Sequence, residues 1–88
     1  MSDRELHLLY FAWLRERLGT AEERVSLPEG VRTVADLFGW LAGRGPGYAA
    51  AFAGQTRLRC AVNQEFSGPD AALGPGDEVA FFPPVTGG

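Results

Sequence analysis

The feature that most constrains the fold is one strong helix pattern in the middle of the chain. Its apolar residues recur at i, i+3, i+4 and i+7, which is one stripe of a helix: Val34, Leu37, Phe38 and Leu41. Thr33 and Asp36, three residues apart, resemble a capping box at its start. Gly43 and the Gly45-Pro46 pair end it. We expect this helix to cover the core.

Several short stretches around this helix alternate between apolar and polar residues, as strands do. The expected strands are residues 6–11, 23–27, 58–62 and 78–82, with a very short return strand at Phe66-Ser67. In the first strand Leu6, Leu8 and Tyr10 share one face, and in the last strand Val79 and Phe81 do. One sheet and one main helix predict an α+β roll.

The other helical signals are short. Residues 12–18 contain good helix formers and are followed by Gly19, which favours a left-handed end. Residues 47–54 are ambiguous and are interpreted as a short helical turn, so the region 44–56 has no firm assignment. Residues 70–73 lie between two turn clusters and are expected to form a single helical turn.

The second face of the predicted sheet is also apolar. It carries Leu9, Phe11 and Phe82, together with Phe66 from the return strand. No second large helix is predicted to cover it, and an uncovered apolar patch on a small domain usually marks a partner site. The competing explanation is that the short helices fold over this face.

Composition narrows the function classes. The chain has 88 residues and a formal net charge of −3, and every basic residue is arginine. Scattered arginines on an acidic chain argue against nucleic-acid binding, and the lack of lysine excludes a P-loop, a Schiff base and an isopeptide branch on this chain. The lone Cys60 alternates with Leu58 and Val62, which indicates a core strand residue. Neither a metal site, a membrane span nor a signal peptide is expected, so we expect a cytoplasmic protein.

The last six residues form the second informative feature: Pro83, Pro84, Val85, Thr86, Gly87 and Gly88. Two prolines favour an extended path, and two glycines end the chain without a Cβ. Such a flexible tail reaches roughly 20 Å when extended. We therefore expect a domain over residues 1–82 and an extended tail over residues 83–88 that can enter a channel in a partner.

Three stretches together resemble the β-grasp, ubiquitin-like sulfur carriers, and most closely the molybdopterin synthase small subunits. They are residues 9–19 (LYFAWLRERLG), residues 61–64 (AVNQ) and residues 76–88 (GDEVAFFPPVTGG). The resemblance covers essentially the whole chain, and the last stretch is its most specific part. It implies a β-grasp roll with a mixed sheet of about five strands packed on one main helix.

The resemblance also implies a carrier that has no activity alone. An E1-like adenylyltransferase is expected to use ATP to join AMP to the Gly88 carboxylate. A sulfurtransferase or cysteine desulfurase then provides the sulfur that replaces AMP and leaves a thiocarboxylate. The tail, with Gly87 as its slender penultimate residue, enters the large synthase subunit in a heterotetramer and donates sulfur to a cyclic pterin precursor. No stably bound cofactor is implied, and Phe11, Phe66 and Phe82 match positions that contact partners.

Two alternatives remain open from the sequence. The same fold can serve thiamin, cysteine or tRNA thiolation, or protein conjugation as a ubiquitin-like modifier, although the Phe-Phe-Pro-Pro-Val stretch favours molybdopterin. In the other alternative the domain is an interaction module and its glycine tail is passive.

Overall fold

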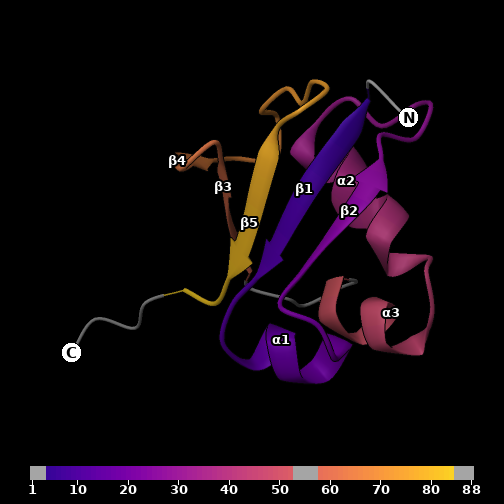
Figure 1. Cartoon of the computed structure of the whole chain (residues 1–88), viewed down its shortest axis with the longest axis vertical. Coiled ribbons are helices and arrows are strands. Elements are labelled where there is room, and N and C mark those ends of the chain that lie inside the picture. Colours follow the sequence, from indigo (N-terminus) through magenta and orange to yellow (C-terminus); the bar gives the residue numbers. More distant parts are fainter. Residues whose placement is uncertain (1–3, 53–57, 85–88) are drawn as a thin grey trace.

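The computed structural model describes residues 4–52 and 58–84, whose helices and strands are labelled in Figure 1. In chain order they are β1 (Glu5–Tyr10), α1 (Trp13–Leu18), β2 (Glu22–Ser26), α2 (Val34–Ala42), α3 (Pro46–Phe52), β3 (Arg59–Val62), β4 (Glu65–Ser67) and β5 (Glu78–Phe82). The strands expected from alternation are all present, with boundaries shifted by one residue in most cases.

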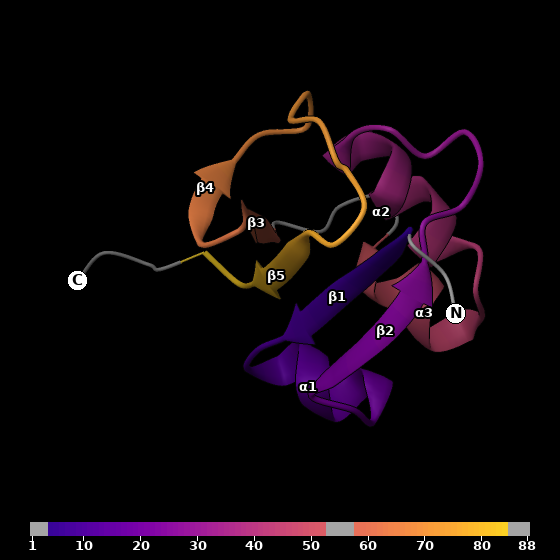
Figure 2. The same ribbon diagram turned by 45° about the horizontal axis from the view of Figure 1, so that its top comes forward.

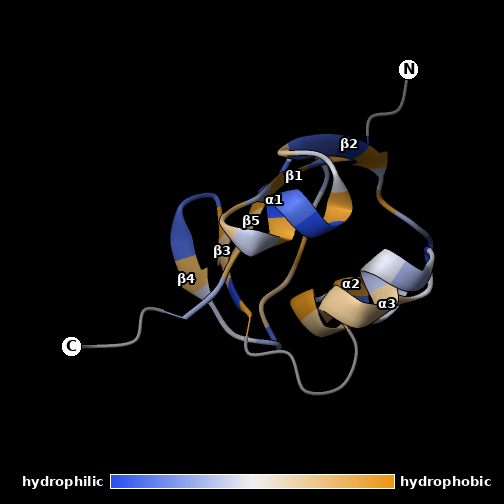
Figure 3. Ribbon diagram, turned by 90° about the horizontal axis from the view of Figure 1, so that it is seen from below, coloured by the Kyte–Doolittle hydropathy of each residue, from blue (hydrophilic) through white to orange (hydrophobic). Residues whose placement is uncertain are grey.

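The strands form one mixed sheet in the order β2-β1-β5-β3-β4. β1 and β5, the first and last strands, lie parallel at its centre, and the other neighbours are antiparallel. The five strands and the mixed pairing confirm the predicted roll. In Figure 3, which looks approximately along the strands, the sheet forms an arc and α2 and α3 lie on its inner side.

The predicted capping box begins α2. The Asp36 backbone N–H donates to Thr33 Oγ1 at 3.2 Å, and the Thr33 N–H donates back to Asp36 Oδ2 at 3.2 Å. The Arg32 N–H also donates to this carboxylate, at 3.0 Å, and these bonds lower the pKa of Asp36. They satisfy donors that the first helical turn leaves without intrahelical partners. The predicted stripe is confirmed, because Val34, Leu37 and Leu41 are buried.

The inner face of the sheet and the helices enclose an aromatic core. Phe81 of β5 lies 5.1 Å from Phe52, 5.5 Å from Phe38 and 5.9 Å from Tyr10, measured between ring centroids. Phe81 and Tyr10 are almost fully buried. Burial of each such side chain contributes about 1.5–3 kcal/mol, so this cluster is the main source of stability.

The structure supports the helical interpretation of the segment after α2. A helix, α3, spans Pro46–Phe52, and its Ala51 and Phe52 are buried in the core. The sheet therefore packs on the main helix α2, and α3 adds a second helix to the same side. Residues 53–57 lie outside the described residues, so that part of the prediction is untested.

The helical turn expected over residues 70–73 is wrong. This segment instead runs beside the start of α2, where Ala72 bridges Thr33. The Leu73 N–H donates to Arg32 O at 2.8 Å, and the Val34 N–H donates to Ala71 O at 3.0 Å. These long-range backbone bonds replace the local bonds that a helical turn would make.

A polar cluster ties α3 to the edge of the sheet. The Glu23 carboxylate of β2 accepts hydrogen bonds from Tyr10 Oη at 2.6 Å, Tyr48 Oη at 2.8 Å and Arg44 Nη1 at 3.1 Å. Burial alone raises the pKa of Glu23, but the three donors outweigh it and hold the pKa below its ordinary value. Burial and the Glu23 charge raise the pKa of both tyrosines. The sequence gives no signal for this cluster, because its members are far apart along the chain.

Across the described residues, 4–52 and 58–84, the search for a helix that could cross a lipid bilayer finds none.

Candidate functional site

The open face of the sheet carries the candidate site. We call Leu9, Phe11, Phe66 and Phe82 the aromatic patch. Phe66 is 83% exposed and Phe11 is 49% exposed, while Leu9 and Phe82 are half-buried. The helices do not cover this face: α2 and α3 lie behind the sheet and α1 lies beyond the end of β1 (Figures 1 and 3). The alternative in which short helices fold over the patch is therefore wrong for the described residues.

The members of the patch lie on three strands, β1, β4 and β5, and at the corner after β1, and strand register brings them together. Leu9 is paired with Ala80, Ala80 with Ala61, and Ala61 with Phe66, so these residues form one row across the sheet. Residues paired in this way point to the same face. The two alanines between Leu9 and Phe66 have only methyl side chains, so an apolar floor joins the larger residues.

The β3–β4 hairpin sets the position of Phe66. Asn63 and Gln64 have φ values of 51° and 71°, as a two-residue hairpin turn requires. The Asn63 side chain accepts from the Glu78 N–H at 3.0 Å and donates to Asp77 Oδ1 at 3.0 Å, which fixes the turn against β5. The Phe66 ring then packs edge-on against Phe82, with the centroids 5.6 Å apart.

Phe11 stands at the corner between β1 and α1. Its N–H donates to Phe81 O at 3.1 Å, so the ends of β1 and β5 are held together. The next residue, Ala12, has φ 58° and ψ −134°, a conformation that residues with a Cβ rarely adopt. Such strain costs about 1–3 kcal/mol and often occurs at functional sites. Trp13 follows, 41% exposed, with the Arg17 guanidinium 5.4 Å from its ring centroid.

The other end of the same face is charged and largely paired within the chain. His7 Nε2 lies 2.6 Å from Glu22 Oε1, and Arg24 Nη1 lies 3.6 Å from Glu5 Oε1. The face therefore has a charged end toward the start of β1 and an aromatic end beside the last residue of β5. The two meet where Leu9 is paired with Glu22, and one arginine, Arg59, lies at the aromatic end.

The tail begins at the aromatic end. Pro83 and Pro84 follow Phe82 directly and are half-buried. Figure 2 shows that these two residues continue from β5 away from the helices, on the side where β4 lies. The remaining predicted site residues, Val85, Thr86, Gly87 and Gly88, lie outside the described residues, so their roles stay predictions. The binding roles of the aromatic patch also stay predictions, although the structure brings its four members together.

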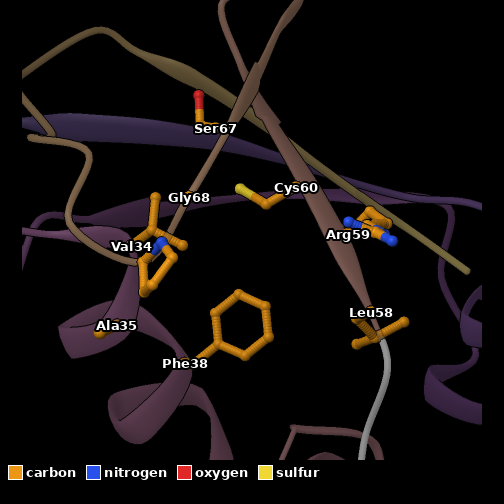
Figure 4. Close-up of a pocket in the computed structure, with 9 residues that line it drawn as sticks. Val34, Ala35, Phe38, Leu58, Arg59, Cys60, Ser67 and Gly68 are labelled. Atoms are coloured by element: carbon orange, nitrogen blue, oxygen red, sulfur yellow. The ribbon is translucent and has the colours of Figure 1, made fainter. Parts of the chain in front are cut away.

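The helix side of the sheet contains a cavity of about 400 Å³ between α2 and the β3–β4 hairpin (Figure 4). Phe38 and Cys60 point into it, and Ser67 Oγ at its edge donates to Glu65 O at 2.8 Å. Burial raises the pKa of the Cys60 thiol to about 11, so it is neutral at pH 7 and a poor nucleophile. The predicted core role of Cys60 is confirmed, and the cavity offers no reactive group.

The described part of the chain also shows no cluster of three or more His, Cys, Asp or Glu side chains that could hold a metal. What the face does offer is an exposed apolar surface next to the start of a narrow terminal segment. An exposed apolar surface of this kind can bind an apolar surface of another protein.

Comparisons with known proteins agree with this description. The family model described as "ThiS family" matches residues 8–88. The chain belongs to the ThiS family. It is 41% identical to the molybdopterin synthase sulfur carrier subunit of Escherichia coli, over 94% of this chain and 99% of that protein. It is 37% identical to the protein of the same name from Haemophilus influenzae, over the same shares of the two chains.

Solved structures extend the comparison to the archaeal members. SAMP1 from Haloferax volcanii superposes on this ThiS-family chain with a TM-score of 0.74 and 31% sequence identity, covering 96% of this chain and 99% of that one. The recognition of the chain as a ubiquitin-like sulfur-carrier relative is thus confirmed in both sequence and fold.

Proposed function

We propose that this chain is the sulfur carrier subunit of a molybdopterin synthase and that Gly88 carries the sulfur. The observation that supports this most is the aromatic patch at the root of the tail, in a chain whose bacterial relatives bear that name. The patch would bind the partner, and the tail would reach the reaction.

The geometry suits this division of work. Phe82 belongs to the patch and immediately precedes Pro83, so docking the patch fixes where the tail starts. From Pro83 the six tail residues reach roughly 20 Å when extended. Because the patch is anchored on a rigid sheet, little positional freedom remains at the root of the tail. Binding energy from the patch is then used to place the terminal carbonyl.

Activation is needed because a carboxylate is a poor electrophile at neutral pH. An E1-like adenylyltransferase would join AMP from ATP to the Gly88 carboxylate, releasing pyrophosphate. The terminal sulfur of a persulfide on a sulfurtransferase or cysteine desulfurase would then attack the Gly88 carbonyl carbon and displace AMP, forming an acyl disulfide. A second thiol would reduce this S–S bond, leaving the thiocarboxylate on Gly88 and a disulfide between the two thiols. Gly88 has no Cβ, so the carbonyl is open to the attacking sulfur.

The partner proteins would provide the acid–base and electrostatic groups. Within residues 4–52 and 58–84 the sole thiol, Cys60, is buried and neutral, and the aromatic patch contains no titratable group. We propose a heterotetramer with the catalytic subunit of the synthase, in which the carrier holds no stably bound cofactor.

Reconstitution tests this proposal. The thiocarboxylated chain is incubated with a molybdopterin synthase catalytic subunit and the cyclic pterin precursor, and the dithiolene product is measured. Product formation is expected with the full chain and none with a variant lacking Gly87 and Gly88, whose melting temperature should be unchanged. Full activity of the shortened variant would favour the passive-tail module.

A second candidate is a protein modifier, because solved structures of small archaeal modifier protein 1 match the chain closely. In that role the activated Gly88 carbonyl would acylate amines of other proteins. The chain has no lysine, so it would not be branched at a side chain of its own copies. Conjugates of higher mass that contain this chain in its host, lost when Gly87 and Gly88 are deleted, would support the modifier role.

A further inference from the structure

Arg59 lies beside the aromatic patch. It begins β3, and its register partner on β5 is Phe82, so the two side chains share the open face of the sheet. Directly paired residues have Cβ atoms about 4.5–5.5 Å apart. In Figure 4 the Arg59 side chain lies on the opposite side of β3 from Cys60, although Arg59 also borders the cavity between α2 and the hairpin. Arg59 is exposed.

Arg59 has no partner among the described residues. Other arginines do: Arg24 pairs with Glu5, Arg44 pairs with Glu23, and Arg17 lies over Trp13. The guanidinium of Arg59 makes no ion pair, hydrogen bond or ring contact within residues 4–52 and 58–84. Arg59 is exposed, so water can reach this charge in the free protein.

Docking of a partner changes the hydration of the Arg59 guanidinium. A partner that covers Phe82 and Phe66 also removes water from a guanidinium one strand away. An arginine that loses its water without gaining an acceptor is strongly unfavourable, so a purely apolar partner surface would bind poorly here. A carboxylate provides what is needed, because it can accept two parallel N–H bonds from the planar guanidinium.

We propose that the protein surface that binds the aromatic patch presents an Asp or Glu carboxylate to Arg59. This inference rests on the proposed function, in which that surface belongs to the synthase catalytic subunit. The patch provides the buried apolar contact, and the Arg59 pair sets the register of docking and rejects partners without an acid at that position. The occupant is thus an apolar protein surface with an acidic residue at its margin.

Charge reversal with a matched control tests the pairing. Arg59→Glu and Arg32→Glu make the same change in net charge, but Arg32 lies in the loop before α2, away from the patch. Affinity for the purified synthase catalytic subunit of the same organism is measured by calorimetry at low and high salt, and melting curves confirm that both variants fold. We expect Arg59→Glu to weaken binding about tenfold or more and to reduce its salt dependence, and Arg32→Glu to weaken it less than about twofold. Arg59→Lys should bind with intermediate affinity, since the ammonium keeps the positive charge but cannot donate two parallel N–H bonds to one carboxylate.

The partner's own acidic residues complete the test. Replacing the partner's Asp or Glu that pairs with Arg59 by Arg should restore binding of the Arg59→Glu variant. The same replacement should weaken binding of the unchanged carrier. Equal affinity of Arg59→Glu and the unchanged carrier would overturn the inference and leave the proposed function intact. Failure of the unchanged carrier to bind would instead overturn the proposed function, and the inference with it. Self-association of the free chain that Arg59→Glu abolishes would also overturn it, by making a second copy the occupant.

Discussion

The two faces of the sheet both carry aromatic residues, but those of the inner face are buried and those of the outer face are largely exposed. On the inner face, Phe81 is fully buried between rings from α2 and α3. On the outer face, Phe66 is 83% exposed, and its one ring contact within residues 4–52 and 58–84 is an edge-on contact with Phe82. Both are aromatic residues on short strands of one sheet. The difference shows that the described domain buries one apolar face by itself and leaves aromatic side chains of the other exposed, which is why we propose the second face for docking.

The largest effect should come from the inner face. Phe81→Ala removes a ring that packs against Tyr10, Phe38 and Phe52, and should lower the free energy of unfolding by about 3–5 kcal/mol. Urea unfolding measures the loss. If that variant does not fold, Phe81→Leu should show a smaller loss in the same direction. Equal decreases in the free energy of unfolding for Phe81→Ala and Phe66→Ala would contradict the difference drawn between the inner and outer faces.

Phe66→Ala should have little effect on stability and a large effect on the affinity for the partner. Its ring loses one edge-on contact with Phe82, so the free energy of unfolding should change by less than about 1 kcal/mol. Affinity for the synthase catalytic subunit should fall by about 2 kcal/mol, roughly 30-fold, as for a central aromatic residue of an interface. Calorimetry and urea unfolding on the same preparation separate the two quantities. Unchanged affinity would mean that the partner binds elsewhere.

Glu23 allows a pH test of the inner face. Glu23→Gln removes the charged acceptor of Tyr10, Tyr48 and Arg44 and should lower the free energy of unfolding by about 1–2 kcal/mol at pH 7. The folded pKa of Glu23 is below its ordinary value of 4.5, so its stabilisation is present above about that pH and is lost as pH falls through the folded pKa.

The stability of the unchanged chain and of the Glu23→Gln variant should therefore converge on acidification below pH 4.5. Thermal unfolding over a pH series measures this, with the exposed Glu29→Gln as the control. A difference that stays constant down to pH 3 would show that the Glu23 charge does not stabilise the fold.

The smallest effect is expected at the charged end of the outer face. The Arg24–Glu5 pair is 3.6 Å long and both side chains are mostly in water. Arg24→Ala should change the free energy of unfolding by less than about 0.5 kcal/mol, and high salt should not change that result. A decrease in the free energy of unfolding above about 1 kcal/mol would show that the charged end stabilises the fold. It would then be wrong that the inner face alone provides the stability.

The sequence predicted what depends on local pattern. Alternation placed Tyr10 and Phe81 on one face and Leu9 and Phe82 on the other, and the Thr33–Asp36 spacing located the start of α2. These signals depend on residues two to four apart, and the structure confirms them.

Features that depend on distant partners were predicted only in part or not at all. The helical turn predicted within residues 47–54 corresponds to α3, but this segment has little contrast between polar and apolar positions, so the burial of Phe52 had no periodic signal. Residues 70–73 lack a helical turn because they pair with the backbone before α2. The position of Arg59 beside Phe82, with no side-chain partner in the described part of the chain, becomes visible only from the sheet register, because the sequence alone shows an ordinary strand arginine.

The most direct test of the account is the mass of the C-terminal peptide from chain purified from its native host. The carrier function predicts a fraction of that peptide heavier by about 16 Da, the exchange of oxygen for sulfur, mapped to Gly88 and not to an oxidised Met, Cys or Trp side chain. A terminal peptide found only as the ordinary carboxylate, from host cells that are making molybdopterin and after incubation with the activating enzyme, ATP and a sulfur donor, would contradict it.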